Sequence, residues 1–233
     1  MEPYVSILNP QNHSYLSGTV KIIAEIYDED NITRAGLSID RNPIWIWSQP
    51  IGKTFVMLYE WNTIPFKDGW HTIEIFAVDN YGNILKRYLE VIVDNTTPLI
   101  DLIHPGNESK LSGSVSIEFV VSDVNFDKVE LRVNQTLMKI WNSSGRQIFE
   151  WNTLNINVGL YFLQFTAFDK AGNTFTMSII VTVEHAQPLT FSPLLQQFIS
   201  AMILIGIILG ALLYYKRTRK HKALKETYYA SDL

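Results

Sequence analysis

The sequence predicts an all-β protein with two tandem β-sandwiches of the Greek-key type, followed by one C-terminal transmembrane α-helix. Three observations predict this architecture. Hydrophobic and polar residues alternate over most of residues 3–185, the chain repeats itself once within that stretch, and residues 194–215 form one long apolar run. Alternation with period two is typical of half-buried strands, and seven or so short strands in about 90 residues are typical of a sandwich.

Four short motifs occur twice and define the repeat. SGTV at 17–20 returns as SGSV at 112–115, an offset of 95. EWNT at 60–63 and DNYGN at 79–83 return 90 residues later as EWNT and DKAGN, and VDNTTP at 93–98 returns as VEHAQP. The smaller offset implies about five extra residues in the first copy, which we place between Ile39 and Glu60. We therefore expect one domain over residues 3–94 and a second over residues 98–185.

The alternating runs mark the strands of each repeat in order. Runs near the start of the copies predict these inward residues: Val20, Ile22, Ala24 and Ile26 in the first copy, and Val115, Ile117, Phe119 and Val121 in the second. A further alternating run in the second copy predicts that Val129, Leu131 and Val133 point inward. The last strands of the two copies are expected at residues 85–93 and 175–183. Gly82 and Gly172 mark hairpin turns, because such turns need a positive φ that glycine adopts without strain.

The order of the motifs carries a resemblance. Both copies contain the same five features in the same order. They are a strand beginning SGxV, a strand ending in Asp28 or Asp123, the WNT triplet, a Gly-x-aromatic motif and the motif Ala-x-Asp-x-x-Gly-Asn. This order resembles the immunoglobulin-like repeats of bacterial and archaeal cell-surface proteins. The resemblance implies spacer or adhesive modules displayed outside the cell and names no ligand. One position departs from the pattern, since His71 stands where such sandwiches place the Tyr that the second copy keeps as Tyr161.

Residues 194–215 are interpreted as a transmembrane anchor. As a helix these 22 residues extend roughly 33 Å, about the thickness of the hydrocarbon core of a bilayer. Residues 186–193, with two prolines, form a stalk before it. Gly206 and Gly210 form a GxxxG motif on one helix face, which predicts a homodimer through the anchor.

Charge predicts the orientation of this anchor. The tail at 216–233 carries six Lys or Arg residues, whereas the chain before it has 13 basic and 21 acidic residues, a net charge of -8. Basic residues next to a span favour the inside, so we expect a cytoplasmic tail and an extracellular N-terminal side at the cell membrane. The acidic ectodomain argues against nucleic acid as a partner.

The first ten residues contain neither a basic segment nor an apolar segment of a signal peptide. We expect either that the chain is the C-terminal part of a longer protein or that its export signal has been lost. Export of the preceding segment by the anchor itself is the third alternative. The chain contains no Cys, so the predicted sandwiches rely on packing alone.

Six N-x-S/T sequons all precede the anchor, which agrees with the topology that the charges predict. They are interpreted as candidate glycosylation sites, although Asn and Ser/Thr also fill β-turns. The six are Asn12, Asn31, Asn95, Asn107, Asn134 and Asn142.

Acidic residues offer a calcium alternative. Asp28 and Asp30 share one loop and Asp94 lies at the linker, where surface modules of the cadherin kind bind Ca²⁺ between domains. The second copy keeps only Asp123 in that loop, and no D-x-D-x-D-G motif occurs. We therefore favour solvated loop acids and no cofactor, with calcium as the alternative.

Tryptophans predict a binding patch and two core positions. Trp45 and Trp47 share one strand face in the segment that differs between the copies, so they are candidates for an exposed patch that anchors a ligand. Trp61 and Trp151 repeat between copies and are expected in the cores. Ordinary strand packing is the alternative for the first pair.

No catalytic motif is present among the five scattered His residues or around any Ser, and thiol chemistry is absent without Cys, so we expect no enzyme activity in this chain. The sequence favours a single-pass cell-surface protein whose modules serve adhesion, ligand display or spacing, with a protein or glycan ligand. Two alternatives stay open. The chain is the membrane-proximal spacer and anchor of a larger exported enzyme, such as a protease or glycosidase, or it is tail-anchored with its sandwiches in the cytosol.

Overall fold

The computed structural model describes residues 2–48, 51–185 and 192–230, with side chains described as far as Arg219 in the last stretch. The chain divides into two compact units, Met1–His185 and Ala186–Leu233. The first unit holds both repeats, which are called module 1 (residues 3–94) and module 2 (residues 98–185) below. Of the predicted stalk, residues 186–191 lie outside the described residues.

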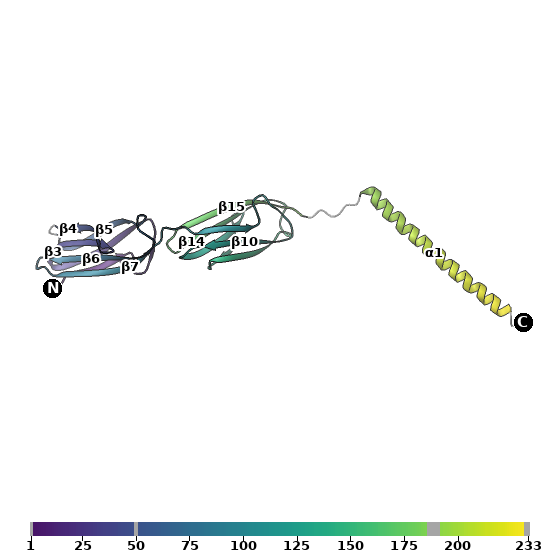
Figure 1. Ribbon diagram of the computed structural model, residues 1–233, viewed down its shortest axis with the longest axis horizontal. Coiled ribbons are helices and arrows are strands. Elements are labelled where there is room, and N and C mark those ends of the chain that lie inside the picture. The colour runs from purple at the N-terminus through teal and green to yellow at the C-terminus, as the bar shows by residue number, and fades with distance from the viewer. Residues whose placement is uncertain (1, 49–50, 186–191, 231–233) are drawn as a thin grey trace. The chain divides into compact units, whose positions relative to one another are not determined.

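Module 1 is an antiparallel sandwich with one parallel strand pair. Its strands are β1 (Tyr4–Asn9), β2 (Tyr15–Leu16), β3 (Thr19–Ile39), β4 (Asn42–Trp47), β5 (Gly52–Asn62), β6 (Gly69–Asp79) and β7 (Ile84–Val93). The long β3 belongs to both layers. Its first half pairs with β1 and β5, whereas its second half pairs with β4 and β6, and β6 continues to β7 and β2 (Figure 1).

Module 2 repeats this arrangement with the long strand broken in two. Its strands are β8 (Leu99–His104), β9 (Lys110–Leu111), β10 (Ser114–Ser122), β11 (Phe126–Val133), β12 (Thr136–Trp141), β13 (Gly145–Asn152), β14 (Gly159–Asp169) and β15 (Thr174–Val183). They form the sheets β13-β10-β8 and β12-β11-β14-β15-β9. The pairs β2–β7 and β9–β15 are parallel and the other pairs are antiparallel. The predicted all-β fold is confirmed.

Each module has its own hydrophobic core. The core of module 1 includes Ile22, Ala24 and Ile26, and the core of module 2 includes Ile117 and Phe119, all without solvent exposure. The alternation that predicted these positions is therefore confirmed. Burying side chains of this size stabilises a fold by about 1.5–3 kcal/mol each, before the entropy cost of ordering them. The predicted core tryptophans are buried as well, with Trp61 2% and Trp151 4% exposed.

Strand registers show that Trp47 and Trp141 are equivalent. Ala35 pairs with Trp47 on one side and Ala77 on the other, and Val129 pairs in the same way with Trp141 and Ala167. The offset at this position is 94. Trp47 therefore does not lie in an unmatched segment, as the sequence analysis assumed. The comparison of short motifs between the copies missed this match, because Lys139 stands at the position equivalent to Trp45 and the two strands therefore share no motif.

The same registers locate the extra residues of module 1. Ile32 pairs with Asp79, and Phe126 pairs with Asp169, so one extra residue lies in the loop after Asp28. The others lie between Trp47 and Trp61. The prediction that all of them lie between Ile39 and Glu60 was wrong for the first one. A single residue added to a polar loop leaves the alternation on both sides unchanged and gives no sequence signal.

His71 performs the structural role of Tyr161. The Tyr161 hydroxyl donates to the carbonyl of Asn157 at 2.9 Å, and His71 Nε2 lies 2.7 Å from the carbonyl of Lys67, again four residues earlier. His71 Nδ1 lies 2.5 Å from a carboxylate oxygen of Asp40. Both ring nitrogens thus face acceptors, and the substitution keeps the hydrogen bond that closes this corner.

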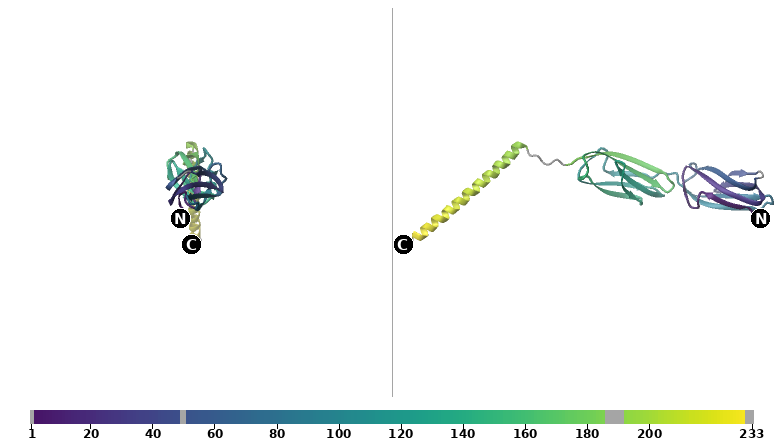
Figure 2. Two further views of the ribbon diagram at one scale, coloured as in Figure 1. Left: turned by 90° about the vertical axis from the view of Figure 1, so that its left-hand side faces the viewer. Right: turned by 180° about the vertical axis from the view of Figure 1, so that it is seen from behind.

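The C-terminal unit contains one helix, α1 (Pro193–Ala230), drawn without a break in Figure 2. It begins one residue before the predicted anchor and extends through most of the predicted tail. The helix is long and apolar enough to cross a membrane, and its most apolar stretch of 18 residues has a mean hydropathy of 2.3. Gly206 and Gly210 lie on its surface, and no other side chain lies within 4 Å of where a Cβ would stand.

Candidate functional site: the joint between the modules

The linker between the modules is fixed onto module 1. Asn95 Oδ1 accepts hydrogen bonds from Thr63 Oγ1 at 2.9 Å and the Gly18 amide at 3.2 Å, and Asn95 Nδ2 donates to the Thr63 carbonyl at 3.0 Å. The Asp68 carboxylate accepts from the Asn95 amide at 2.8 Å and the Thr96 hydroxyl at 2.6 Å. Each such bond contributes about 0.5–1.5 kcal/mol net, so together they restrict rotation of the linker.

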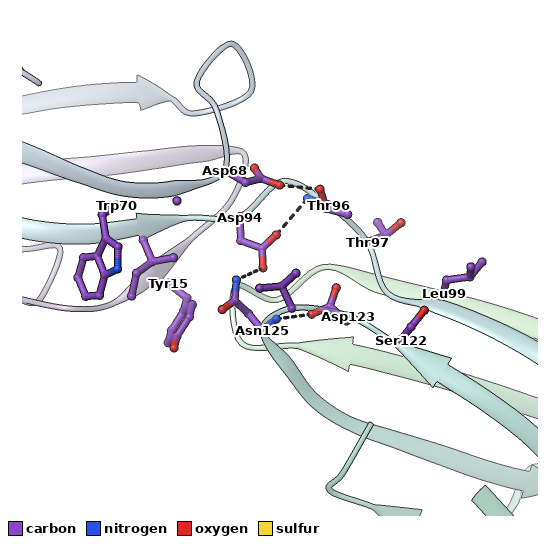
Figure 3. A pocket seen from close by; sticks show the side chains of 13 residues that line it. Tyr15, Asp68, Trp70, Asp94, Thr96, Thr97, Leu99, Ser122, Asp123 and Asn125 are labelled. Atoms are coloured by element: carbon purple, nitrogen blue, oxygen red, sulfur yellow. Dashed lines mark hydrogen bonds between the residues drawn. The ribbon is translucent and has the colours of Figure 1, made fainter. Parts of the chain in front are cut away.

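Side chains of module 2 hold this fixed linker from the other side. Asn125 Nδ2 donates to Asp94 Oδ2 at 2.7 Å, and Asn173 Nδ2 donates to the Asp94 carbonyl at 2.8 Å (Figure 3 shows the first of these). The Ser17 hydroxyl donates to Asn173 Oδ1 at 2.5 Å. Asn173 therefore uses both ends of its amide across the joint.

A cation–π contact adds to the joint. The Lys170 ammonium lies 5.3 Å from the centre of the Tyr15 ring. Contacts of this kind contribute about 0.5–1 kcal/mol at exposed sites. The joint is therefore made by polar and aromatic side chains, with no hydrophobic core shared by the two modules among the described residues.

Three carboxylates converge where the modules meet. One oxygen of each of Asp94, Asp123 and Asp169 lies within 4.8 Å of the others, and Asp94 and Asp169 are buried. Burial raises the pKa of Asp123, and the neighbouring carboxylates of Asp94, Asp169 and Asp68 raise it further, against the hydrogen bond from the Asn125 amide. Bringing these charges together costs free energy that the surrounding amide donors offset in part.

The calcium candidates of the sequence analysis do not form one site. Asp28 and Asp30 follow the first half of β3, whereas Asp94 lies beside the start of that half, about 30 Å away at roughly 3.3 Å per residue. The structure instead places Asp94 with Asp123 and Asp169, a set that the sequence analysis did not assemble. Hydrogen bonds from Asn125 and Asn173 reach the carboxylates of Asp94 and Asp169, and calcium stays the alternative to the expectation of no cofactor.

A cleft of about 790 Å³ opens beside the joint, between residues of both modules. Trp70, Tyr15 and Leu99 line its apolar side, and Asp68 and Asp123 line its polar side (Figure 3). Asp68 accepts hydrogen bonds from the linker, and Asp123 accepts one from the amide of Asn125, whose side chain binds Asp94. The cleft therefore depends on the same contacts that set the geometry of the joint.

Comparisons with known proteins agree with this fold. Residues 3–75 match the family model for a bacterial Ig domain. The two modules are tandem immunoglobulin-like repeats. No curated protein matches the chain.

Several solved structures are similar to the immunoglobulin-like unit. The fibronectin(III)-like modules of CbhA from Clostridium thermocellum share 15% identity over 81% of this chain and 98% of that chain, with a TM-score of 0.49. An I-band fragment of titin shares 15% identity over 79% and 66%, with a TM-score of 0.48. A tetra-tandem repeat from the extending region of a large adhesion protein shares 16% identity over 78% and 49%, with a TM-score of 0.34.

The predicted aromatic patch lies on an edge strand of the first immunoglobulin-like module. Trp45 and Trp47 lie on β4 with ring centres 5.9 Å apart, and both stand about 6.1 Å from the ring of Phe55 on β5. Trp47 is 42% exposed, although its equivalent Trp141 is 8% exposed. The sequence analysis missed Phe55, which the strand order brings to the two tryptophans.

The Asn side chains of the sequons differ in the hydrogen bonds that they make. Asn12 and Asn107 accept equivalent hydrogen bonds through Oδ1, from the amides of Glu90 and Ile180. Asn134 accepts one from the Phe162 amide. These bonds leave the amide nitrogens of Asn107 and Asn134 to carry a glycan, whereas Asn12 Nδ2 also lies 3.3 Å from His13 Nε2. Asn95 is different because its nitrogen donates within the joint, so we expect it to stay unmodified. Asn31 and Asn142 are exposed.

Proposed function

We propose that this chain is a single-pass, membrane-anchored surface protein whose immunoglobulin-like modules hold a recognition surface away from the bilayer. The observation that carries the proposal is α1, an apolar helix long enough to cross a membrane. The basic residues after it support a cytoplasmic C-terminal tail.

The hydrogen-bonded joint supports the spacing part of the proposal. A linker as short as 95–97 allows bending only if its contacts break, and Asn95, Thr96 and Asn173 tie it to both modules. Restricted bending would keep a ligand site at a defined distance from the neighbouring module. Module 1 would therefore act as the displayed module and module 2 as its support.

Trp47, the exposed member of the aromatic patch, supports adhesion to a protein or glycan ligand, because exposed aromatic rings stack on sugars and anchor interfaces; the partly buried Trp45 and Phe55 pack beside it. Binding of the intact protein to a glycan array and to cell extracts would be compared for Trp47→Ala and for Tyr88→Ala, an exposed aromatic residue outside the patch. Loss of binding in the first variant alone is expected. Equal binding by both variants would remove the patch from the proposal.

Protease accessibility on intact cells tests the topology. With tags at residues 1 and 233, we expect added protease to remove the N-terminal tag and to leave the C-terminal tag intact. The reverse pattern would refute surface display and favour the tail-anchored alternative. Glycan occupancy at Asn12 and Asn107, measured by mass spectrometry, gives an independent readout of the same orientation.

The second candidate is the spacer and anchor of a larger exported enzyme. The same joint and helix would serve it equally well, because a rigid spacer suits a displayed enzyme as well as a displayed ligand site. Mass measurement of the native protein immunoprecipitated with an antibody against module 2 separates the two. A mass near 26.8 kDa plus glycans favours display by the modules themselves.

A further inference from the structure

Each module has an entry face and an exit face, and the joint is an exit face docked on an entry face. The exit face of module 1 comprises residues 15–18 and 94–96, and the entry face of module 2 comprises residues 123–125 and 169–173. Module 1 has an entry face of its own at residues 28–31 and 79–83, at the opposite end of its strands from its exit face.

The turns at the centre of the two entry faces contain the same two hydrogen bonds, with equal lengths in both modules. Asp79 Oδ1 accepts from the Asn83 amide at 2.8 Å and Asp79 Oδ2 accepts from Asn83 Nδ2 at 2.6 Å; Asp169 and Asn173 make the same two bonds at the same lengths. In module 2 this turn positions Asn173 to bind the linker across the joint. Module 1 therefore contains the same Asp–Asn hydrogen bonds that orient the side-chain amide of Asn173 in module 2.

The neighbouring loop is repeated with one extra residue in module 1. Asp28 accepts from the amide two residues later at 2.7 Å, as Asp123 does. The carbonyl of Asn31 accepts from the Asn80 amide, and the carbonyl of Asn125 accepts from the Lys170 amide. Asn31 therefore shares this backbone hydrogen bond with Asn125, whose side chain donates to Asp94 across the joint, although the φ of Asn31 is 81°.

The exit face that fits such an entry face has a specific composition. It needs the hydroxyl of Ser17, the carboxylate of Asp94 and the Asn-Thr-Thr linker, all of which the exit face of module 1 uses to hold module 2. The exit face of module 2 ends instead in Glu184 and His185 and lacks that linker. In the described chain, the one matching exit face is already docked.

We propose that the entry face of module 1 docks the exit face of a further immunoglobulin-like module, one with the Ser-Gly and Asp-Asn-Thr residues that module 1 carries. Two positions adapt the face, since Asn80 replaces Lys170 and Tyr81, 73% exposed, replaces Ala171. The cation–π contact of the known joint is therefore not reproduced, and Tyr81 supplies an aromatic surface in its place. The sequon at Asn31 lies on this face, so a glycan there would exclude the partner module.

The test adds a copy of module 1 to the full chain. Residues 3–97 are inserted before Pro3, so that the chain's own Asn95-Thr96-Thr97 linker leads into the entry face of the second copy. The chain has no Cys, so spin labels go to Cys introduced at the exposed Tyr88 of both copies. The reference is the unextended chain labelled at Tyr88 and the exposed Ile148. Both proteins are held in lipid nanodiscs, and pulsed electron spin resonance measures the distance distributions.

We expect the new joint to give a distribution as narrow as that of the natural joint. Asn83→Ala in the second copy should broaden it at least twofold, as Asn173→Ala broadens the natural joint. A broad distribution in the unsubstituted chimera, or no response to Asn83→Ala, would overturn the proposal. These readouts do not depend on membrane orientation, so they stand or fall separately from surface display.

Two controls separate docking from damage to the fold. In the unextended chain, Asn83→Ala should leave the Tyr88–Ile148 distribution unchanged, because Asn83 lies at the end of module 1 opposite the natural joint. If Asn83→Ala broadens this distribution, the substitution has disturbed the turn at residues 79–83 itself. The substitutions Asn31→Ala, in the second copy, and Asn125→Ala then test the docking in its place. Equal broadening of the new and natural joints by that pair supports docking, and broadening of the natural joint alone refutes it.

Discussion

At the scale of single residues, two carboxyl groups of module 2 have pKa values shifted in opposite directions. Burial and nearby carboxylates raise the pKa of Asp123, so its ionised form is disfavoured in the folded state. Hydrogen bonds from Lys128 and then Arg132 lower the pKa of Glu130, against its burial. The two residues should therefore give stability profiles of opposite sign as the pH falls.

We expect Asp123→Asn to stabilise the protein at neutral pH. A raised folded-state pKa means that Asp123 costs stability above that pKa, and the cost disappears as the pH falls below the unfolded value of about 3.9. The Asn keeps the acceptor for the Asn125 amide. Calorimetry should show a melting temperature a few degrees higher at pH 7, roughly 2–4 °C per kcal/mol, and no gain at pH 3.

The matched control for this prediction is Asp28→Asn, at the equivalent position of module 1. Asp28 makes the same hydrogen bond but belongs to no cluster of three carboxylates among the described residues. Its substitution should change the melting temperature little. An equal gain in both variants would attribute the effect to the side-chain amide and not to the carboxylates of the joint.

We expect Glu130→Gln to destabilise module 2 at neutral pH by about 1 kcal/mol, the usual scale of a charge-assisted hydrogen bond less its solvent screening. The lowered folded-state pKa means that this stability is present above the unfolded value of about 4.3 and is lost as the pH falls through the folded value. Urea unfolding at pH 7 and pH 3 measures the difference. A loss of equal size at both pH values would show that charge is not the cause.

The sequence predicted individual core residues better than it predicted the residues of the joint. Ile22 and Ile117 were found because alternation reports directly which side of a strand faces inward. Asp169 was visible in the motif DKAGN but was interpreted only as part of a turn. Its proximity to Asp94 depends on which end of the sandwich the turn occupies, and strand periodicity carries no information on that.

At the scale of strands, Gly36 lies on β3 in the half that pairs with β4 and β6. Its two nearest neighbours are the Phe76 side chain and the Trp45 backbone. A Cβ at Gly36 would stand 2.4 Å from the Phe76 ring and 3.1 Å from the carbonyl oxygen of Trp45. The Arg34 guanidinium lies 5.7 Å from the centre of the same ring. Phe76 therefore covers the glycine backbone, and this contact joins β4, β3 and β6.

We expect Gly36→Ala to destabilise module 1 by about 1–3 kcal/mol, the usual cost of overpacking. Gly106→Ala is the control, because a Cβ there would meet only the Ser109 hydroxyl at an ordinary 3.5 Å. Thermal unfolding of both variants measures the difference. Partial recovery in Gly36→Ala/Phe76→Ala would confirm that the ring is the obstacle, and its absence would point to the carbonyl of Trp45.

At the scale of the helix, Gly206 and Gly210 predict close approach of two anchors. We expect Gly206→Leu and Gly210→Leu each to lower the association constant of the dimer at least tenfold, about 1.4 kcal/mol. Ala211→Leu adds the same bulk on another face of α1 and should have little effect. Energy transfer between labelled chains in detergent micelles measures all three. Equal loss in Ala211→Leu would mean that helix bulk, and not the glycine face, governs association.

The order of motifs predicted the whole first unit, because a two-fold repeat with strand alternation leaves few ways to form closed sandwiches. The sequence also predicted the helix, whose apolar residues end at Tyr215, directly before the basic residues that begin at Lys216. It did not predict that β3 runs unbroken through both layers, since one residue at Asn31 with a φ of 81° lets the strand continue. Such a local backbone conformation is decided by tertiary pairing with β6.

The parallel pairing of β2 with β7 and of β9 with β15 has a mechanical consequence. If a tether pulls the two ends of the unit apart, the early strand and the last strand of each module are drawn in opposite directions along their length. Their hydrogen bonds, such as Thr182 N to Ser109 O at 2.9 Å and Asp94 N to Leu16 O at 2.9 Å, then carry the load together in shear and do not unzip one by one. Thr182→Pro removes one such donor from module 2. In single-molecule pulling it should lower the rupture force of module 2, while module 1 of the same molecule ruptures at its original force.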